Sequence, residues 1–169
     1  MSRELRRDVM YQLKPLSREA IAEALESAAR YRLHNEPGAA ESLCLDVLAV
    51  EPDNQEALKN IVLAMSDRLG KGYAIGSSDI NDYVERLCDE YERAFYNGVV
   101  FEKRAKAMLA NGGLYAYEMC AKAMECFERA ESLRPDGIND PVLRWNECAR
   151  LIDRNRLHPH IPSANDMIE

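Results

Sequence analysis

Two segments of this chain, residues 40–52 and 123–135, share the same spacing of side chains. Each has a small residue, a bulkier apolar residue four positions later, a small or β-branched residue three positions after that, and a proline five positions further on. The positions are Ala40, Cys44, Val47 and Pro52 in the first segment and Ala123, Phe127, Ala130 and Pro135 in the second. This spacing is typical of the second helix of a two-helix repeat, which the proline terminates. We therefore expect a stack of helix pairs.

Apolar residues recur at three- and four-residue steps along most of the chain, a period that indicates helices. Turn-forming residues divide this pattern, and Asn97-Gly98 is expected to be one of the turns. The expected helices cover residues 3–14, 18–34, 39–50, 55–69, 80–95, 99–110, 117–133 and 141–152. No segment favours a strand, so the expected fold class is all-α.

The two-helix pattern resembles the tetratricopeptide repeat (TPR), a helix–turn–helix unit of 34 residues. Matches to its signature fall at Ala28, Tyr31, Ala40, Cys44 and Pro52. From Pro52 to Pro135 is 83 residues, which is two repeats plus 15 residues. Expected insertions at 70–78 and 111–116 contain nine and six residues and account for the difference. Glu90 and Arg104 depart from the pattern in the middle of the array.

The resemblance implies a right-handed superhelical stack of antiparallel helix pairs. About three TPR-like units are followed by a capping helix that carries Trp145. The expected domains are a lead-in segment 1–17, a TPR-like helical domain 18–153 and a C-terminal tail 154–169. Small bacterial tetratricopeptide proteins of unassigned role have a similar pattern.

The resemblance also implies a concave groove, lined by the first helix of each unit, in which members of the family bind a peptide or a partner helix. The residues that would face it are Arg32, Lys59, Asn60, Leu63, Lys103, Lys106, Asn146 and Arg150. Lysine and asparagine can hold a carboxylate by hydrogen bonds, and with lysine these are charge-assisted. The expected ligand is therefore an acidic or C-terminal peptide, although Leu63 replaces one expected amide.

Charge and cysteine content narrow the class of protein further. The net charge is −7, which argues against a protein that binds the phosphate backbone of nucleic acids. The five cysteines form no C-x-x-C motif, the start of the chain lacks the apolar core of a secretion signal, and no apolar run is long enough to span a membrane. We therefore expect a cytoplasmic protein that neither binds nucleic acid nor inserts into a membrane.

Three functions stay open at this point. The first is a non-catalytic adaptor that binds a protein or peptide, and the second is a chaperone-like carrier for one client protein. The third is an enzyme whose Cys–His site is assembled only by the fold, because no nucleophile has a base near it in the sequence. His158 and His160 lack the further ligands that a metal site would need. No cofactor and no metal are expected.

The C-terminal tail carries apolar and acidic residues that could dock in a groove of the same chain or of a second copy. They are Ile161, Met167, Ile168 and Glu169. This hypothesis leaves a homo-oligomer open.

Overall fold

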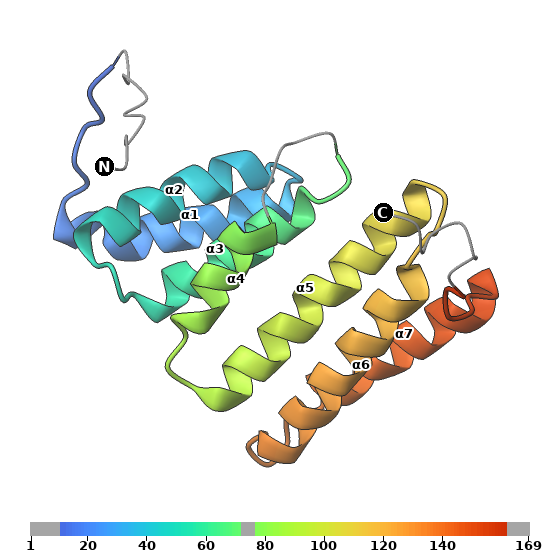
Figure 1. The fold of residues 1–169 in the computed structure, drawn as a ribbon. Coiled ribbons are helices and arrows are strands. Elements are labelled where there is room, and N and C mark those ends of the chain that lie inside the picture. The colour runs from blue at the N-terminus through green and yellow to red at the C-terminus, as the bar shows by residue number, and fades with distance from the viewer. Residues whose placement is uncertain (1–10, 72–76, 162–169) are drawn as a thin grey trace, which may run out of the picture.

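The computed structural model describes residues 11–71 and 77–161, and all regular structure in these ranges is helical (Figure 1). A short 3-10 helix, Arg18–Ala20, leads into the first α-helix. The α-helices are α1 (Ile21–Leu33), α2 (Pro37–Val50), α3 (Gln55–Asp67), α4 (Ser77–Glu85), α5 (Glu90–Ala110), α6 (Ala116–Leu133) and α7 (Asp140–Asn155). The all-α prediction is therefore confirmed for the described residues.

Local sequence explains where several helices begin. The Asn54 side chain accepts a hydrogen bond from the Ala57 backbone N–H at 2.9 Å and so caps α3. Asp89 caps α5 in the same way, through the Glu92 backbone N–H at 2.9 Å. Proline occupies the first turn of α2 and of α7, where its missing N–H costs no helical hydrogen bond.

Each helix packs against the next one along the chain, and α3 also contacts α1 and α5. The small and apolar residues of the repeated pattern lie in the core, as the spacing predicts. All seven are completely buried: Ala40, Cys44, Val47, Ala123, Phe127, Ala130 and, in the first helix, Ala28. One apolar cluster extends from α1 to α5, and two smaller clusters join α5, α6 and α7. Figure 1 shows α5, α6 and α7 running alongside one another.

The predicted turn at Asn97-Gly98 is wrong, because α5 continues through both residues. The break in this region lies instead at residues 86–89, which separate α4 from α5 and end at the Asp89 cap. Gly98 is buried within α5, where a Cβ atom would lie 2.5 Å from the Phe127 ring. The glycine therefore allows α5 and α6 to approach each other closely and does not form a turn.

The described part of the C-terminal tail folds back onto α6. Leu157 packs against a buried cluster of α5, α6 and α7. The backbone N–H of His160 donates to Glu118 Oε1 at 2.6 Å, and Ile161 is 85% exposed. The other members of the expected docking segment lie outside the described residues: Met167, Ile168 and Glu169.

The expected helix over residues 3–14 lies mostly outside the described residues, and its described end, residues 11–14, is not helical. Within residues 11–71 and 77–161, no helix combines the length and the apolar character that crossing a bilayer requires.

Replacing Gly98 by alanine is expected to destabilise the protein. The new methyl group would push against the fully buried Phe127 ring, and such overpacking costs about 1–3 kcal/mol. This cost exceeds the gain of up to about 1 kcal/mol that alanine brings to a helix. Chemical denaturation of Gly98→Ala and wild type measures the difference.

Gly38→Ala is the matched control, because at this helical position no atom other than those of the adjacent residues and the surrounding helix backbone lies within 4 Å of the added methyl group. We expect its free energy of unfolding to equal or exceed that of the wild type. A Gly98→Ala protein as stable as Gly38→Ala would contradict the close approach of α5 and α6.

Candidate functional site

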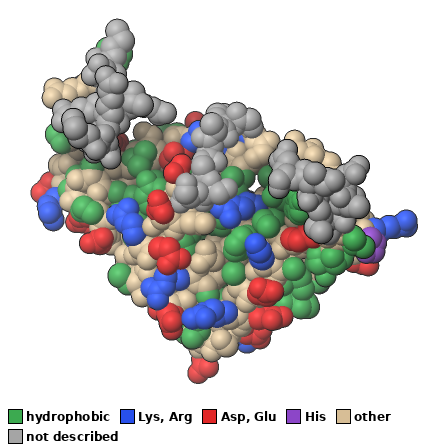
Figure 2. Space-filling model, in the orientation of Figure 1, with side chains coloured by type: hydrophobic (Ala, Val, Ile, Leu, Met, Phe, Trp, Pro, Cys, Tyr) green, Lys and Arg blue, Asp and Glu red, His purple; other side chains and the backbone are tan. Residues whose placement is uncertain are grey.

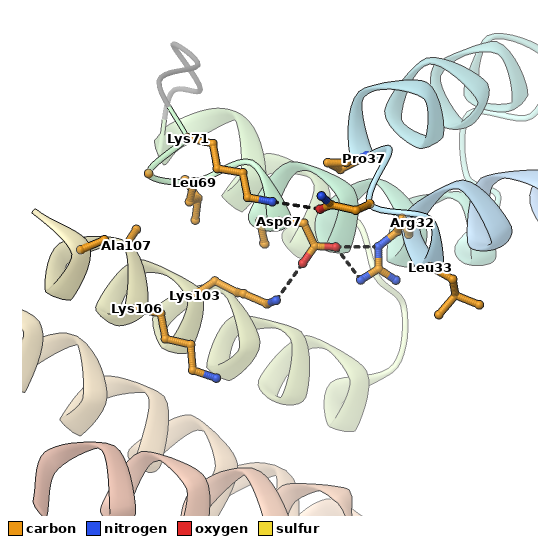
Figure 3. A pocket seen from close by; sticks show the side chains of 13 residues that line it. Arg32, Leu33, Pro37, Asp67, Leu69, Lys71, Lys103, Lys106 and Ala107 are labelled. Carbon is orange, nitrogen blue, oxygen red and sulfur yellow. Dashed lines mark hydrogen bonds and ion pairs between the residues drawn. The ribbon is translucent and has the colours of Figure 1, made fainter. Parts of the chain in front are cut away.

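A pocket of about 570 Å³ lies where the ends of α1 and α3 face the second half of α5 (Figure 3). We call it the basic pocket. Its lining residues are Arg32, Leu33, Asn35, Pro37, Ser66, Asp67, Leu69, Gly70, Lys71, Lys103, Lys106, Ala107 and Ala110. The three elements are distant in sequence, so only the packed fold creates this pocket.

Positive charge dominates the basic pocket. Four of its lining residues are cations, Arg32, Lys71, Lys103 and Lys106, whereas Asp67 is the one carboxylate among the described lining residues. The whole chain has a net charge of −7. On the face that Figure 2 shows, acidic and basic side chains are otherwise interspersed. A concave site with excess positive charge favours an anionic ligand.

Asp67 joins three helices at the wall of the basic pocket. Arg32 of α1 donates from Nε and Nη2 to Asp67 Oδ2, at 3.0 and 2.8 Å. Lys103 of α5 lies 2.8 Å from Asp67 Oδ1, so each carboxylate oxygen has a cationic partner (Figure 3). Asp67 is the last residue of α3, where the helix dipole disfavours a negative charge. The two cations offset that repulsion.

The pKa of the Asp67 carboxyl reflects the same balance. Partial burial alone would raise this pKa. The hydrogen bonds and positive charges of Lys103 and Arg32 act in the opposite direction and hold the pKa below its ordinary value. Asp67 is therefore ionised at neutral pH and keeps both partners in place.

The other two lysine side chains of the pocket differ in how they are held. Lys106 Nζ lies 2.6 Å from Glu102 Oε1 and 3.8 Å from Glu147. Lys71 is exposed and donates to Asn35 Oδ1 at 3.3 Å, so its charge is not neutralised by this neutral partner. Lys71 and the partly exposed Lys106 are thus the cations that a ligand can reach most easily.

Ion pairs between α3, α5 and α7 continue beyond the basic pocket. Lys59 Nζ of α3 lies 2.8 Å from Glu92 of α5, and this hydrogen bond raises the pKa of the Lys59 ammonium. Glu102 of α5 has only 3% of its side chain exposed and binds both Lys106 and Arg144, the latter at 2.8 Å. A buried carboxylate needs such partners to remain charged.

The structure divides the eight predicted groove residues between different surroundings. Arg32, Lys103 and Lys106 line the basic pocket. Lys59 binds Glu92, and Leu63 packs against the cluster around Phe127. The other predicted residues lie outside the described pocket lining: Asn60, which donates to the Glu56 carbonyl, and Asn146 and Arg150 on α7.

The sequence reasoning missed the acidic partners, Asp67 and Glu102. Glu102 could have been noticed, because it lies four residues after Gly98 and three before Ala105, on the buried stripe of its helix. A charged residue on such a stripe suggests a partner on a neighbouring helix. Asp67 gives no comparable signal, since its partners are 35 and 36 residues away.

The cysteines and other ligating residues offer little chemistry. None of the five cysteines, all of which are described, is in a disulfide. Burial raises the pKa of Cys44 and of Cys148 to about 12, so both stay protonated at neutral pH. Among residues 11–71 and 77–161, no three His, Cys, Asp or Glu side chains are grouped so that they could hold a metal ion.

No protein-family model matches the chain, and the searches of curated proteins and of solved structures find no match to it. The family resemblance of the repeat spacing therefore stays a prediction.

Asp67→Asn is expected to lower the free energy of unfolding by about 1–3 kcal/mol at neutral pH, because it weakens the hydrogen bonds that join α1, α3 and α5. The folded-state pKa of Asp67 lies below the ordinary value of 3.8. Its stabilising effect is therefore complete above that pH and is lost as the pH falls through the folded-state pKa. Denaturation curves from pH 7 to pH 2 should show the two proteins converging in acid.

Asp82→Asn is the control for charge alone, because Asp82 is exposed on α4. Its free energy of unfolding should equal that of the wild type at every pH. If the difference in free energy of unfolding between Asp67→Asn and the wild type were the same from pH 7 to pH 2, the role assigned to the ionised carboxylate would be contradicted.

The thiols are expected to react at very different rates with iodoacetamide at neutral pH. Cys88 is exposed and should be modified first, whereas buried Cys44 and Cys148 should react only after unfolding in guanidinium chloride. Peptide mapping by mass spectrometry gives the rate for each site. Rapid modification of Cys44 or Cys148 in the folded protein would contradict their protonated, buried state and favour the Cys–His enzyme hypothesis.

Proposed function

We propose that this chain is a non-catalytic adaptor that binds an acidic peptide segment of a partner protein in the basic pocket. The observation that carries the proposal is the set of four cations around one carboxylate on a protein whose net charge is −7. Complementary charge speeds the encounter with an acidic partner and selects against basic ones. Lysine and arginine also form charge-assisted hydrogen bonds to carboxylates.

The proposal includes a TPR-like right-handed stack of helix pairs. What supports it is the pairing of α1 with α2, α3 with α4 and α5 with α6, together with the contacts from α3 to α1 and α5. α7 packs on α6 in the position of a capping helix. In such a stack, the first helices of successive units share one face, and the basic pocket belongs to that set of helices.

The pocket narrows the expected binding region. Arg32 and Lys103 already share Asp67, and Lys59 binds Glu92. These side chains would have to exchange an internal carboxylate for that of a ligand, and so would Lys106, which binds Glu102, whereas Lys71 has no carboxylate partner among the described residues. We therefore assign the first contact with the acidic peptide to Lys71. The second contact is assigned to Lys106, the most exposed of the paired cations of the pocket, and the binding region to the part of the expected groove nearest α1.

The non-catalytic part of the proposal is supported by the thiols, because the buried ones have raised pKa values and are poor nucleophiles. A cytoplasmic setting is also proposed. It is supported by five cysteines without a disulfide, a state that a reducing compartment maintains.

The experiment measures binding of a fluorescein-labelled tetra-aspartate peptide, with blocked ends, to the full chain by anisotropy at low ionic strength. Lys71→Gln/Lys106→Gln should weaken binding by about tenfold, since each lost charge pair near the surface contributes up to about 1 kcal/mol. Melting curves check that the variant is folded, because Arg144 still accompanies Glu102.

The matched control is Lys14→Gln/Lys122→Gln, which removes the same charge at two exposed lysines outside the pocket lining. Its affinity should stay within about twofold of the wild type. If both double variants weakened binding of the peptide equally, binding would depend on the net charge of the protein and not on the basic pocket. Absence of binding, or a loss confined to Arg150→Gln on α7, would overturn the assignment to the basic pocket.

A further inference from the structure

A second pocket adjoins the basic pocket, and its volume is about 310 Å³. We call it the apolar pocket, because carbon-rich side chains make up most of it. Its lining residues are Leu69, Gly70, Arg104, Ala107, Met108, Asn111 and Leu114. It lies between the end of α3, the last turns of α5 and the loop that leads to α6.

The two pockets share one wall, which consists of Leu69, Gly70 and Ala107. The turn that follows α3 approaches α5 very closely at this wall, since a Cβ atom at Gly70 would lie 2.8 Å from Ala107 Cβ. Gly70 also has φ +76°, a conformation that glycine adopts without strain. Since the two pockets share these residues, an extended peptide of a few residues is long enough to reach both.

Leu114 is the residue that most clearly exposes apolar surface here. It is 58% exposed, although it lines the apolar pocket together with the half-buried Met108. An aliphatic side chain that entered this pocket would remove its own surface and that of Leu114 from water, which favours binding. Arg104, held over the Phe101 ring and near Asn81, adds a further cation to the lining of this pocket.

We propose that the two pockets form one recognition surface for an extended peptide that carries an acidic side chain and an aliphatic side chain close together in sequence. The acidic group occupies the basic pocket, and the aliphatic group occupies the apolar pocket. This inference rests on the proposed adaptor function and adds the specificity that charge alone does not provide. Charge complementarity on one side and apolar surface on the other select this class of partner.

The test uses labelled, end-blocked peptides in which a leucine follows four aspartates at a distance of one, two or three positions. The reference peptides carry asparagine in place of the leucine. For at least one spacing, the wild-type full chain should bind the leucine peptide at least about fivefold more tightly. Leu114→Asn should abolish this preference, so that the leucine and asparagine peptides bind it equally.

Leu143→Asn is the matched control, because Leu143 is 61% exposed on α7, outside both described pocket linings. It should retain the preference for leucine. Equal binding of leucine and asparagine peptides at all three spacings, with Lys71→Gln/Lys106→Gln still weakening both, would overturn this inference alone. If no peptide binds, or if that double variant has no effect, the proposed function fails as well.

One further variant tests whether the surface binds a separate partner or residues 162–169 of this same chain. Residues 162–169 include Asp166, Met167 and Ile168, whose side chains have the same chemistry as the proposed ligand. Full-length Met167→Asn/Ile168→Asn should bind the leucine peptide with the affinity of the wild type. A gain of tenfold or more would show that this segment competes for the surface and would overturn the assignment to a separate partner.

Discussion

The carboxylate of Asp67 is the interaction on which the arrangement of α1, α3 and α5 depends most. It ends α3, and it binds Arg32 of α1 and Lys103 of α5 through different oxygens. Apolar packing favours contact between these helices, and the shapes of the packed side chains restrict their crossing angles. Hydrogen bonds from two cations to one carboxylate are directional, so they add a constraint on how α1 and α3 meet α5.

The same chemistry divides the basic residues of the protein into structural and accessible ones. Lys59 and Arg144 bind acidic side chains of neighbouring helices, and the carboxylate of Glu102 is buried between its partners. These pairs act within the fold. At the basic pocket the cations outnumber the carboxylate among the described lining residues, and the described partner of Lys71 is the neutral side chain of Asn35. The excess charge is therefore concentrated where the surface is hollow, beside a pocket of apolar character.

Local sequence predicted the helices that have their own terminators. The proline-ended segments became α2 and α6, and the small residues at their predicted positions are buried. The turn predicted at Gly98 was wrong, because turn propensity is a local property, whereas this glycine accommodates the Phe127 ring of another helix. Glu90, which does not fit the predicted repeat pattern, is the first residue of α5 and directly follows the Asp89 cap. Arg32, Lys103 and Lys106 were predicted to share a surface, but the position of Asp67 between two of them depends on tertiary packing.

The central claim is that an acidic peptide binds where α1, α3 and α5 meet. Backbone amide chemical shifts of the isotope-labelled protein, recorded while the blocked tetra-aspartate peptide is added, test this claim most directly. We expect the changes to cluster at residues 32–37, 66–71 and 103–110, which contain the lining of the basic pocket. Changes centred on α7, around Asn146 and Arg150, or spread evenly over the surface would contradict the account.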